Sequence, residues 1–276
     1  MKLFSRVAII GVGLIGGSFG LALKKKALAK EIIGIGHRQK SIDQALRVRA
    51  IDQGYLGLDS IRGADLVVLS APVKEIINIL PKLKNLISED CLIIDAGSTK
   101  SEIIKIAEKH RLRFIGCHPL AGMEKKGPEN ARADLFKNSL CLLVPPKKYS
   151  PQDLSRVKKL WEALESRTMV LNSARHDRIL AFTSHLPHAV VFSLIDCLKS
   201  DYLKFGAGGL KDTTRIGLSD PLLWRDIFLT NRKELLSAIN TFEKSFQRLK
   251  SLIKNNNDGA LRAYLEKSRD KRRAIL

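Results

Sequence analysis

Residues 6–23 of the 276-residue chain read RVAIIGVGLIGGSFGLAL, and this stretch decides the fold. The segment RVAII is typical of a short buried strand, and the GVGLIG that follows it begins an apolar-periodic helix. GxGxxG between a strand and a helix indicates a dinucleotide-binding unit. The first glycine permits a tight turn, the second lets a pyrophosphate approach the backbone, and the third lets the helix pack on the strand. We therefore expect a dinucleotide to contact Gly11, Gly13, Leu14, Ile15 and Gly16.

The second strand bears on which dinucleotide is used. It reads EIIGIGH over residues 31–37, and an NAD-binding unit ordinarily ends this strand with an acidic residue that bonds the ribose 2′-hydroxyl. Here Gly36 holds that place, followed by His37 and Arg38, which we expect at the cofactor. No carboxylate would repel a 2′-phosphate, and Arg38 could pair with one. The pattern favours NADP; in the alternative, Arg38 is an ordinary surface cation and NAD serves.

Strands and helices continue to alternate. Further strands are expected at residues 65–70, 91–95, 113–117 and 139–144, with a short one before residue 172. This alternation indicates the α/β class, with a Rossmann-type, doubly wound parallel sheet. Ligands bind at the carboxyl ends of such strands. Those ends carry Ser70, Ala71, Pro72, Ser98 and His118.

The strand pattern stops after Asn172, which predicts two domains. Residues 1–172 form the dinucleotide-binding domain, and residues 173–276 form an all-helical domain. We expect helices over 173–199, bent at Pro187, and over 222–254, with a last helix near the basic C-terminal segment. Such a helical domain commonly supplies the far wall of the substrate pocket and a dimer interface, so a homodimer is expected.

The amino-acid composition limits the classes of binding partner that we expect. Lys and Arg number 48 against 28 Asp and Glu, a formal charge of +20, which favours anionic partners. Only 6% of residues are aromatic, a poor supply for stacking bases, so nucleic acid is not expected. Five glycines interrupt residues 7–23, and Lys24 follows, which argues against a signal peptide or membrane span. Four cysteines without a CxxC pair fit a reducing cytoplasm.

Several polar residues are candidates for chemistry. Histidine is the natural acid–base group near neutral pH, and His118 ends a strand at the expected nicotinamide side. Ser98 could orient that imidazole or a substrate hydroxyl, although STKSE is also typical of a helix cap. Arg215 suits a substrate carboxylate, or alternatively forms a buried structural pair with Asp212. His188 is expected to line the substrate pocket.

Three histidines share the helix that begins near Ser173. On a straight helix His185 and His188 lie on one face, whereas His176 lies far from both, so a compact trio needs a bend at Pro187. HLPH is not a metal-binding HExxH motif, and no metal is expected.

Six segments occur in an order that resembles one family. They are GVGLIGGS from residue 11, DAGSTK from 95, HPLAGMEKKG from 118, HD at 176, SHLPHAV from 184 and GGLKDTTRIGLSDPLLWRDI from 208. The chain resembles the prephenate and arogenate dehydrogenases of tyrosine biosynthesis. The resemblance implies an oxidative decarboxylation of a small dianionic substrate: hydride leaves for the nicotinamide, CO₂ leaves the cyclohexadienyl ring, and aromatisation drives the reaction.

The resemblance also implies roles for individual residues. His118 matches the catalytic histidine that bonds the 4-hydroxyl and helps remove its proton, and Ser98 matches the serine that supports it. Substrate-binding positions are matched by Arg215 for a carboxylate, His176 and His188 in the pocket, and Glu124 as an acidic gate. Met123 and Gly36 depart from the family pattern. Prephenate and arogenate both remain open, and the alternative is another NAD(P)-dependent hydroxyacid-type dehydrogenase.

Overall fold

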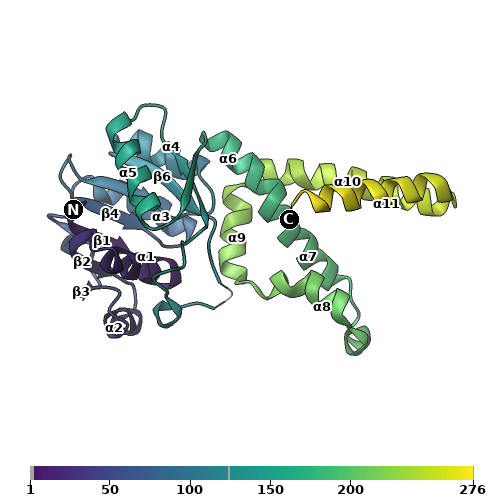
Figure 1. Ribbon diagram of the computed structural model, residues 1–276, viewed down its shortest axis with the longest axis horizontal. Coiled ribbons are helices and arrows are strands. Elements are labelled where there is room, and N and C mark those ends of the chain that lie inside the picture. The colour runs from purple at the N-terminus through teal and green to yellow at the C-terminus, as the bar shows by residue number, and fades with distance from the viewer. Residues whose placement is uncertain (1–2, 124, 276) are drawn as a thin grey trace. The chain divides into compact units, whose positions relative to one another are not determined.

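The structure, a computed structural model, describes residues 3–123 and 125–275. The chain divides into two compact units, Met1–Asn231 and Arg232–Leu276. An eight-stranded sheet lies at the centre of the first unit (Figure 1). The boundary expected at residue 172 stays a prediction. The strands are β1 (Phe4–Ile10), β2 (Ala29–Ile35), β3 (Gln53–Tyr55), β4 (Leu66–Leu69), β5 (Leu92–Asp95), β6 (Phe114–Pro119), β7 (Leu140–Val144) and β8 (Arg167–Val170).

The sheet has the order β3-β2-β1-β4-β5-β6-β7-β8. The chain runs outward from β1 to β2 and β3 and then returns to β4 on the other side of β1, so the carboxyl ends of β1 and β4 flank a topological switch point. This confirms the expected doubly wound α/β fold. One feature differs from an all-parallel sheet: β7 is antiparallel to β6, and β8 then runs parallel to β7.

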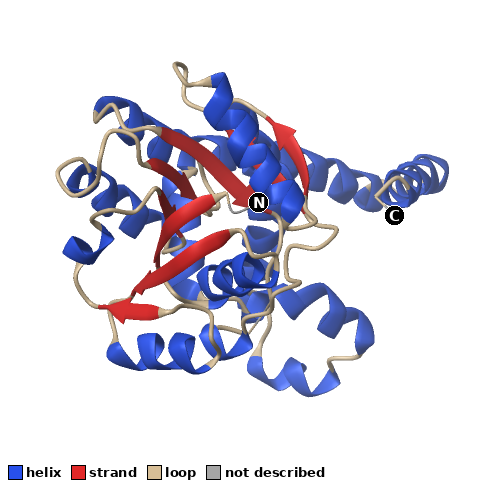
Figure 2. Ribbon diagram, turned by 60° about the vertical axis from the view of Figure 1, so that its left-hand side comes forward, coloured by secondary structure: helices blue, strands red, loops and turns tan. Residues whose placement is uncertain are grey.

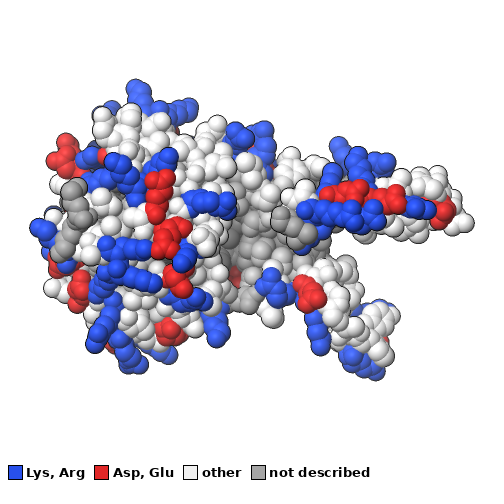
Figure 3. All heavy atoms as spheres, in the orientation of Figure 1, with Lys and Arg blue, Asp and Glu red and all other residues white. Residues whose placement is uncertain are grey.

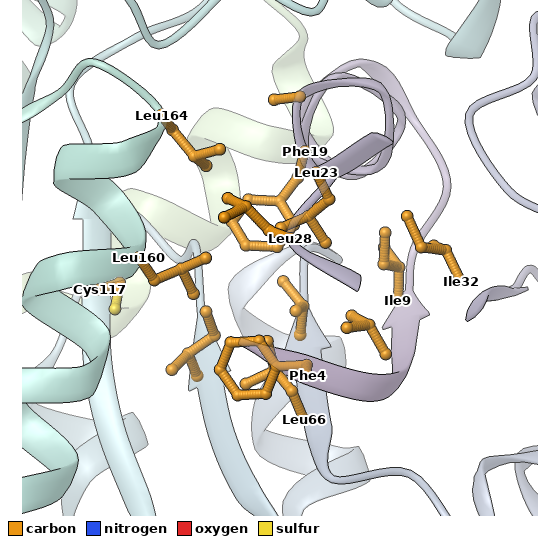
Figure 4. Close-up of a cluster of buried hydrophobic side chains, with 14 of the residues drawn as sticks. Phe4, Ile9, Phe19, Leu23, Leu28, Ile32, Leu66, Cys117, Leu160 and Leu164 are labelled. Atoms are coloured by element: carbon orange, nitrogen blue, oxygen red, sulfur yellow. The ribbon is translucent and has the colours of Figure 1, made fainter. Parts of the chain in front are cut away.

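Helices cover both faces of the sheet (Figure 2). Side chains of α1, α2 and α5 share one core cluster, and those of α3 and α4 share the other. In Figure 4, Phe19 and Leu23 of α1 and Leu160 of α5 point toward strand residues such as Ile9. These helices are α1 (Leu14–Lys25), α2 (Gln39–Arg47), α3 (Val73–Leu83), α4 (Ser101–Lys109) and α5 (Pro151–Ala163).

The helix expected over 173–199 is interrupted by a π-helical turn. It consists of α6 (Ser173–Leu180), the turn Ala181–His185 and α7 (Leu186–Asp196). The turn lies just before Pro187, which lacks a backbone N–H and so cannot continue the regular helical ladder. By length and composition alone this run could cross a membrane, which is weak evidence for a span.

The helix expected over 222–254 is two helices. Short 3-10 turns and α8 (Gly208–Thr214) lead to α9 (Pro221–Thr230), and the chain leaves helical geometry at Asn231. The side chain of Asn231 is used in tertiary hydrogen bonds described below. In the second unit, α10 (Arg232–Lys254) and α11 (Asp258–Arg273) form a hairpin in which Ser245 Oγ lies 2.9 Å from Tyr264 Oη.

Candidate active site

A pocket of about 380 Å³ opens at the carboxyl ends of the central strands. It lies where the fold predicts a ligand, beside the turn between β1 and α1. Many of the expected site residues meet there. The lining includes Gly13, Leu14, Ile15, Ser70, Ala71, Pro72, Ser98 and His118, together with Met123, Lys125 and Lys126 from the loop after β6.

The glycine turn shows which glycines serve the fold. Gly11 has φ +97°, and a Cβ there would lie 2.6 Å from the carbonyl oxygen of Ser70. A Cβ at Gly16 would lie 2.1 Å from the carbonyl oxygen of Gly11. At Gly13, the N-cap of α1, a Cβ would meet nothing within 4 Å. The open space at the helix N-terminus therefore fits a dinucleotide pyrophosphate.

This contrast gives a prediction. Gly13→Ala should leave the fold nearly unchanged but raise the Kd for the dinucleotide about tenfold, because the new methyl group occupies the pyrophosphate's path. Gly16→Ala is the matched control, and it should lower Tm, since its methyl group collides with backbone. Calorimetric titration and thermal unfolding measure the two effects. An unchanged Kd in Gly13→Ala would contradict the assigned role.

His37 and Arg38 lie farther out, exposed between β2 and α2. Arg38 occupies the N-cap position of α2. Gly36 is half-buried, and a Cβ there would lie 3.0 Å from Ile42, so its own side of the turn is closely packed. The exposed cation sits just after the strand position where an NAD-type carboxylate is expected.

His118 belongs to a chain of hydrogen-bonded side chains. Its Nδ1 lies 2.9 Å from Nε2 of His176, and Nδ1 of His176 lies 2.8 Å from Oδ1 of Asp177. The Asp177 carboxylate also accepts hydrogen bonds from the backbone N–H groups of Lys100 and Ser101, each at 2.8 Å. His118 borders the pocket, whereas His176 and Asp177 are fully buried behind it.

The charge states along this chain follow from burial and hydrogen bonding. Burial holds the pKa of His118 well below its usual range, and the neighbouring His176 and Lys100 lower it further. Burial also lowers the pKa of His176, although Asp177 opposes this effect. For Asp177, burial acts to raise the pKa, but hydrogen bonds from His176 and Ser101 keep it below the ordinary value. Two neutral imidazoles therefore end on an ionised carboxylate near pH 7.

A buried ion pair supports the loop that carries Ser98. Nζ of the fully buried Lys100 donates to Oδ2 of Asp95 at 2.7 Å and to the carbonyl oxygen of Gly97 at 2.5 Å. Asp95 also accepts from the backbone N–H groups of Gly97 and Cys117. Ser98 is half-buried on the pocket wall. The N-terminus of α4 is capped by Asp177 rather than by Ser98, so the helix-cap alternative for Ser98 does not hold.

His185 and His188 pack around Trp224 and Asn231. The His188 ring stacks on Trp224 with centroids 3.4 Å apart, and its Nδ1 donates to the carbonyl oxygen of Ser184. Burial lowers the pKa of His185 to about 4. The side-chain amide of Asn231 donates to the Asp177 carbonyl oxygen at 2.8 Å and lies 3.0 Å from Nδ1 of His185. The π turn brings His185 to the same cluster as Asp177, one residue after His176.

Two of the expected substrate-binding residues do not line this pocket. Among the described residues that line it, neither Arg215 nor His188 is present. Arg215 begins the 3-10 turn Arg215–Leu218 and is exposed, as is Asp212, so these two do not form the buried pair considered as an alternative. Glu124 lies outside the described residues.

Sequence reasoning assigned no site role to Asp177, Lys100, Asp95 or Asn231. The first three could have been noticed, because Asp177 lies in HD and Asp95 and Lys100 lie in DAGSTK, two of the segments that carry the family resemblance. Their partners, however, lie on other elements: Asp177 is 77 residues from Lys100, and Asn231 is 54 residues from Asp177. Only the fold brings them together.

Comparison with known proteins agrees with this geometry. Residues 19–170 match the family model described as prephenate dehydrogenase, nucleotide-binding domain, and residues 172–267 match prephenate dehydrogenase, dimerization domain. Cyclohexadienyl dehydrogenase of Zymomonas mobilis is 31% identical over 288 residues, which span 100% of this chain and 97% of that protein.

Two solved structures extend the comparison. Prephenate dehydrogenase from A. aeolicus in complex with hydroxyphenyl propionate and NAD⁺ superposes with a TM-score of 0.94 at 36% identity, covering 99% of this chain and 98% of that one. Synechocystis arogenate dehydrogenase superposes with a TM-score of 0.85 at 26% identity, covering 98% and 100%. With both family models matched and these likenesses spanning its length, the chain belongs to the prephenate dehydrogenase family.

Proposed function

We propose that this chain catalyses the oxidative decarboxylation of prephenate or arogenate in tyrosine biosynthesis, with hydride transfer to NAD(P). One observation carries the proposal. The pocket is bordered on one side by the glycine turn at the start of α1 and on another by a neutral histidine, His118. A hydride acceptor and a general base can therefore face one substrate in a single cavity.

The bound dinucleotide would supply the hydride acceptor, and the protein's residues would supply positioning and proton transfer. His118 accepts the proton of the ring 4-hydroxyl as the C4–H bond gives up its hydride. The bond between C1 and its carboxylate then breaks, CO₂ leaves, and the electron pair completes the aromatic ring. His118 returns its proton to the 4-oxygen. Ser98, on the wall beside His118, orients the imidazole or the hydroxyl.

Binding roles for other residues rest on the resemblance. Arg215 is proposed to bind a substrate carboxylate, and Glu124 and His188 to act at the substrate side. The cations support an anionic substrate: Lys125 lines the pocket, and the chain has a formal charge of +20. On the face in Figure 3, Lys and Arg are spread among acidic residues over the first unit and form no single patch there.

Assembly and location are further proposals. The second family model is described as a dimerization domain, which supports a homodimer through the helical region. All four cysteines are free thiols, three of them buried, which supports a cytoplasmic location. We also propose that neither nucleic acid nor a membrane is a partner, because the polar residues around the pocket suit a small molecule.

The deciding experiment is nicotinamide reduction by the purified protein. Prephenate and arogenate are each tested with NAD⁺ and with NADP⁺, and absorbance of the reduced nicotinamide is followed. Turnover in any of the four combinations supports the reaction and identifies the preferred pair. If none of the four combinations gives reduced nicotinamide while the dinucleotide still binds, the substrate assignment is overturned and another hydroxyacid-type dehydrogenase is favoured.

Cofactor preference gives a separate prediction. Arg38→Ala should raise the Kd for NADP⁺ about tenfold and that for NAD⁺ less than about twofold, because only the 2′-phosphate needs a charged donor. The exposed position of Arg38 makes a fold defect unexpected. Fluorescence titration with both dinucleotides measures the ratio. Lys40→Ala, two residues along and equally exposed, is the matched control and should change neither Kd appreciably. Equal loss of both affinities in Arg38→Ala would count against NADP selection.

A further inference from the structure

We propose that Asp177, acting through His176, fixes the tautomer of His118 so that Nε2 of His118 is the proton acceptor in the pocket. This inference rests on the proposed function, in which His118 is the general base. It assigns Asp177 and His176 as positioning residues. It also gives His176 a place behind the base, in contrast to the pocket-lining role that the family resemblance implies.

Asp177 is the fixed end of this chain of hydrogen bonds. A carboxylate only accepts hydrogen bonds, and the Asp177 carboxylate is met by three donors: the backbone N–H groups of Lys100 and Ser101 and the ring of His176. The two N–H groups belong to the first turn of α4, whose orphan donors and positive dipole end favour an anion. Asp177 is therefore held ionised and in one orientation.

His176 lies between Asp177 and His118. Its Nδ1 lies 2.8 Å from a carboxylate oxygen that cannot donate, so Nδ1 carries the proton. The ring is fully buried, and burial disfavours its doubly protonated form. A neutral imidazole with a proton on Nδ1 has a lone pair on Nε2. His176 consequently presents an acceptor to His118.

The hydrogen bond from His118 to His176 fixes which ring nitrogen of His118 carries the proton. Nδ1 of His118 lies 2.9 Å from the accepting Nε2 of His176, so Nδ1 of His118 is the donor. His118 is neutral, and its Nε2 therefore has a free lone pair on the opposite side of the ring. Since His118 borders the pocket, this nitrogen is the one available to a substrate hydroxyl. The opposite tautomer would present an N–H there and could not accept the proton.

The closest chemical parallel is the carboxylate that orients the histidine of a hydrolase triad, where the wrong tautomer costs about 10⁴ in rate. Here the carboxylate acts through a second ring, so we expect a smaller effect. Asp177→Asn should lower kcat by about 10²-fold, with KM changed less than about threefold, because the pocket wall itself is untouched.

The tautomer can be read in the resting protein. With ¹⁵N-labelled histidine, long-range ¹H–¹⁵N spectra distinguish a protonated from an unprotonated ring nitrogen, and the signals missing in His118→Asn identify those of His118. The expected result is a protonated Nδ1 and an unprotonated Nε2 on His118. A wild-type spectrum with the proton on Nε2 would overturn the proposal, whether or not the protein reduces NAD(P).

Two variants of His176 separate positioning from packing, and they serve if Asp177→Asn fails to fold. His176→Gln keeps a side-chain carbonyl that can accept from Nδ1 of His118, whereas His176→Leu fills similar space without an acceptor. We expect the leucine variant to lose about 10²-fold in kcat and the His118 tautomer, and the glutamine variant to lose less than about tenfold. Equal losses in both variants, or a leucine variant that keeps the tautomer and its kcat within threefold, would overturn the proposal.

Failure of the proposed function has a different signature. If the wild-type protein turns over none of the four substrate and cofactor combinations, no kcat values can be compared. The ¹⁵N spectra of wild type, His176→Gln and His176→Leu still decide whether the relay of Asp177 and His176 sets the tautomer of His118. A relay that sets the tautomer in a protein inactive in all four combinations supports the positioning inference and overturns only the reaction.

Discussion

Replacing His118 by asparagine is expected to lower kcat by about 10²–10⁴-fold while leaving Tm nearly unchanged. The asparagine amide nitrogen can occupy the place of Nδ1 and donate to Nε2 of His176, so the buried hydrogen bond is kept. The variant has no group at the position of Nε2 that could accept a proton near neutral pH. The loss should therefore fall on turnover rather than on folding, and steady-state kinetics with thermal unfolding measures both.

Dinucleotide affinity is the control for this variant. His118 lies on β6, whereas the glycine turn follows β1, so the substitution leaves the glycine turn unchanged. The Kd for NAD(P) should therefore change less than about twofold. A fall in kcat of less than threefold would contradict the role of general base. The pH dependence of the wild-type protein offers a second check. Because burial lowers the pKa of His118, the imidazole stays neutral at pH values below the ordinary pKa of histidine. We therefore expect kcat/KM to decline only in more acidic solution.

The sequence predicted the first half of the molecule well because its signals are local. A buried strand, three glycines and an amphipathic helix are all read within twenty residues, and Gly11 indeed has the positive φ that only a glycine turn tolerates readily. The direction of β7 could not be predicted in this way, since a hydrophobic strand pattern is the same whether its partner is parallel or antiparallel. The three-residue β3 is too short to produce an alternating pattern.

The histidine cluster shows why the site was harder to predict. On a straight helix with about 100° per residue from His176 to His188, His176 lies away from His185. The π turn at 181–185 lies between them, so the straight-helix spacing does not apply, and Asn231 contacts both the Asp177 carbonyl oxygen and the His185 ring. Asn231 itself lies inside an apparently continuous helical pattern. Its role is visible only once the chain is seen to leave the helix there.

The other large effect is expected from the buried pair beneath Ser98. Lys100→Met should lower the free energy of unfolding by about 3–5 kcal/mol, because it leaves the fully buried carboxylate of Asp95 without its counter-ion. For a chain of this size the corresponding drop in Tm is on the order of 10 °C. Nζ of Lys100 also holds the carbonyl oxygen of Gly97, so the loop that carries Ser98 loses a tether and kcat should fall as well. Denaturant unfolding and steady-state kinetics measure the two losses.

The double variant tests whether the missing counter-ion is the cause. Asp95→Asn/Lys100→Met removes both charges and should be less destabilised than the sum of the two single variants, which is the sign of direct coupling. Additive losses in the double variant would mean that Lys100 stabilises the loop through packing and its bond to Gly97 rather than through its charge.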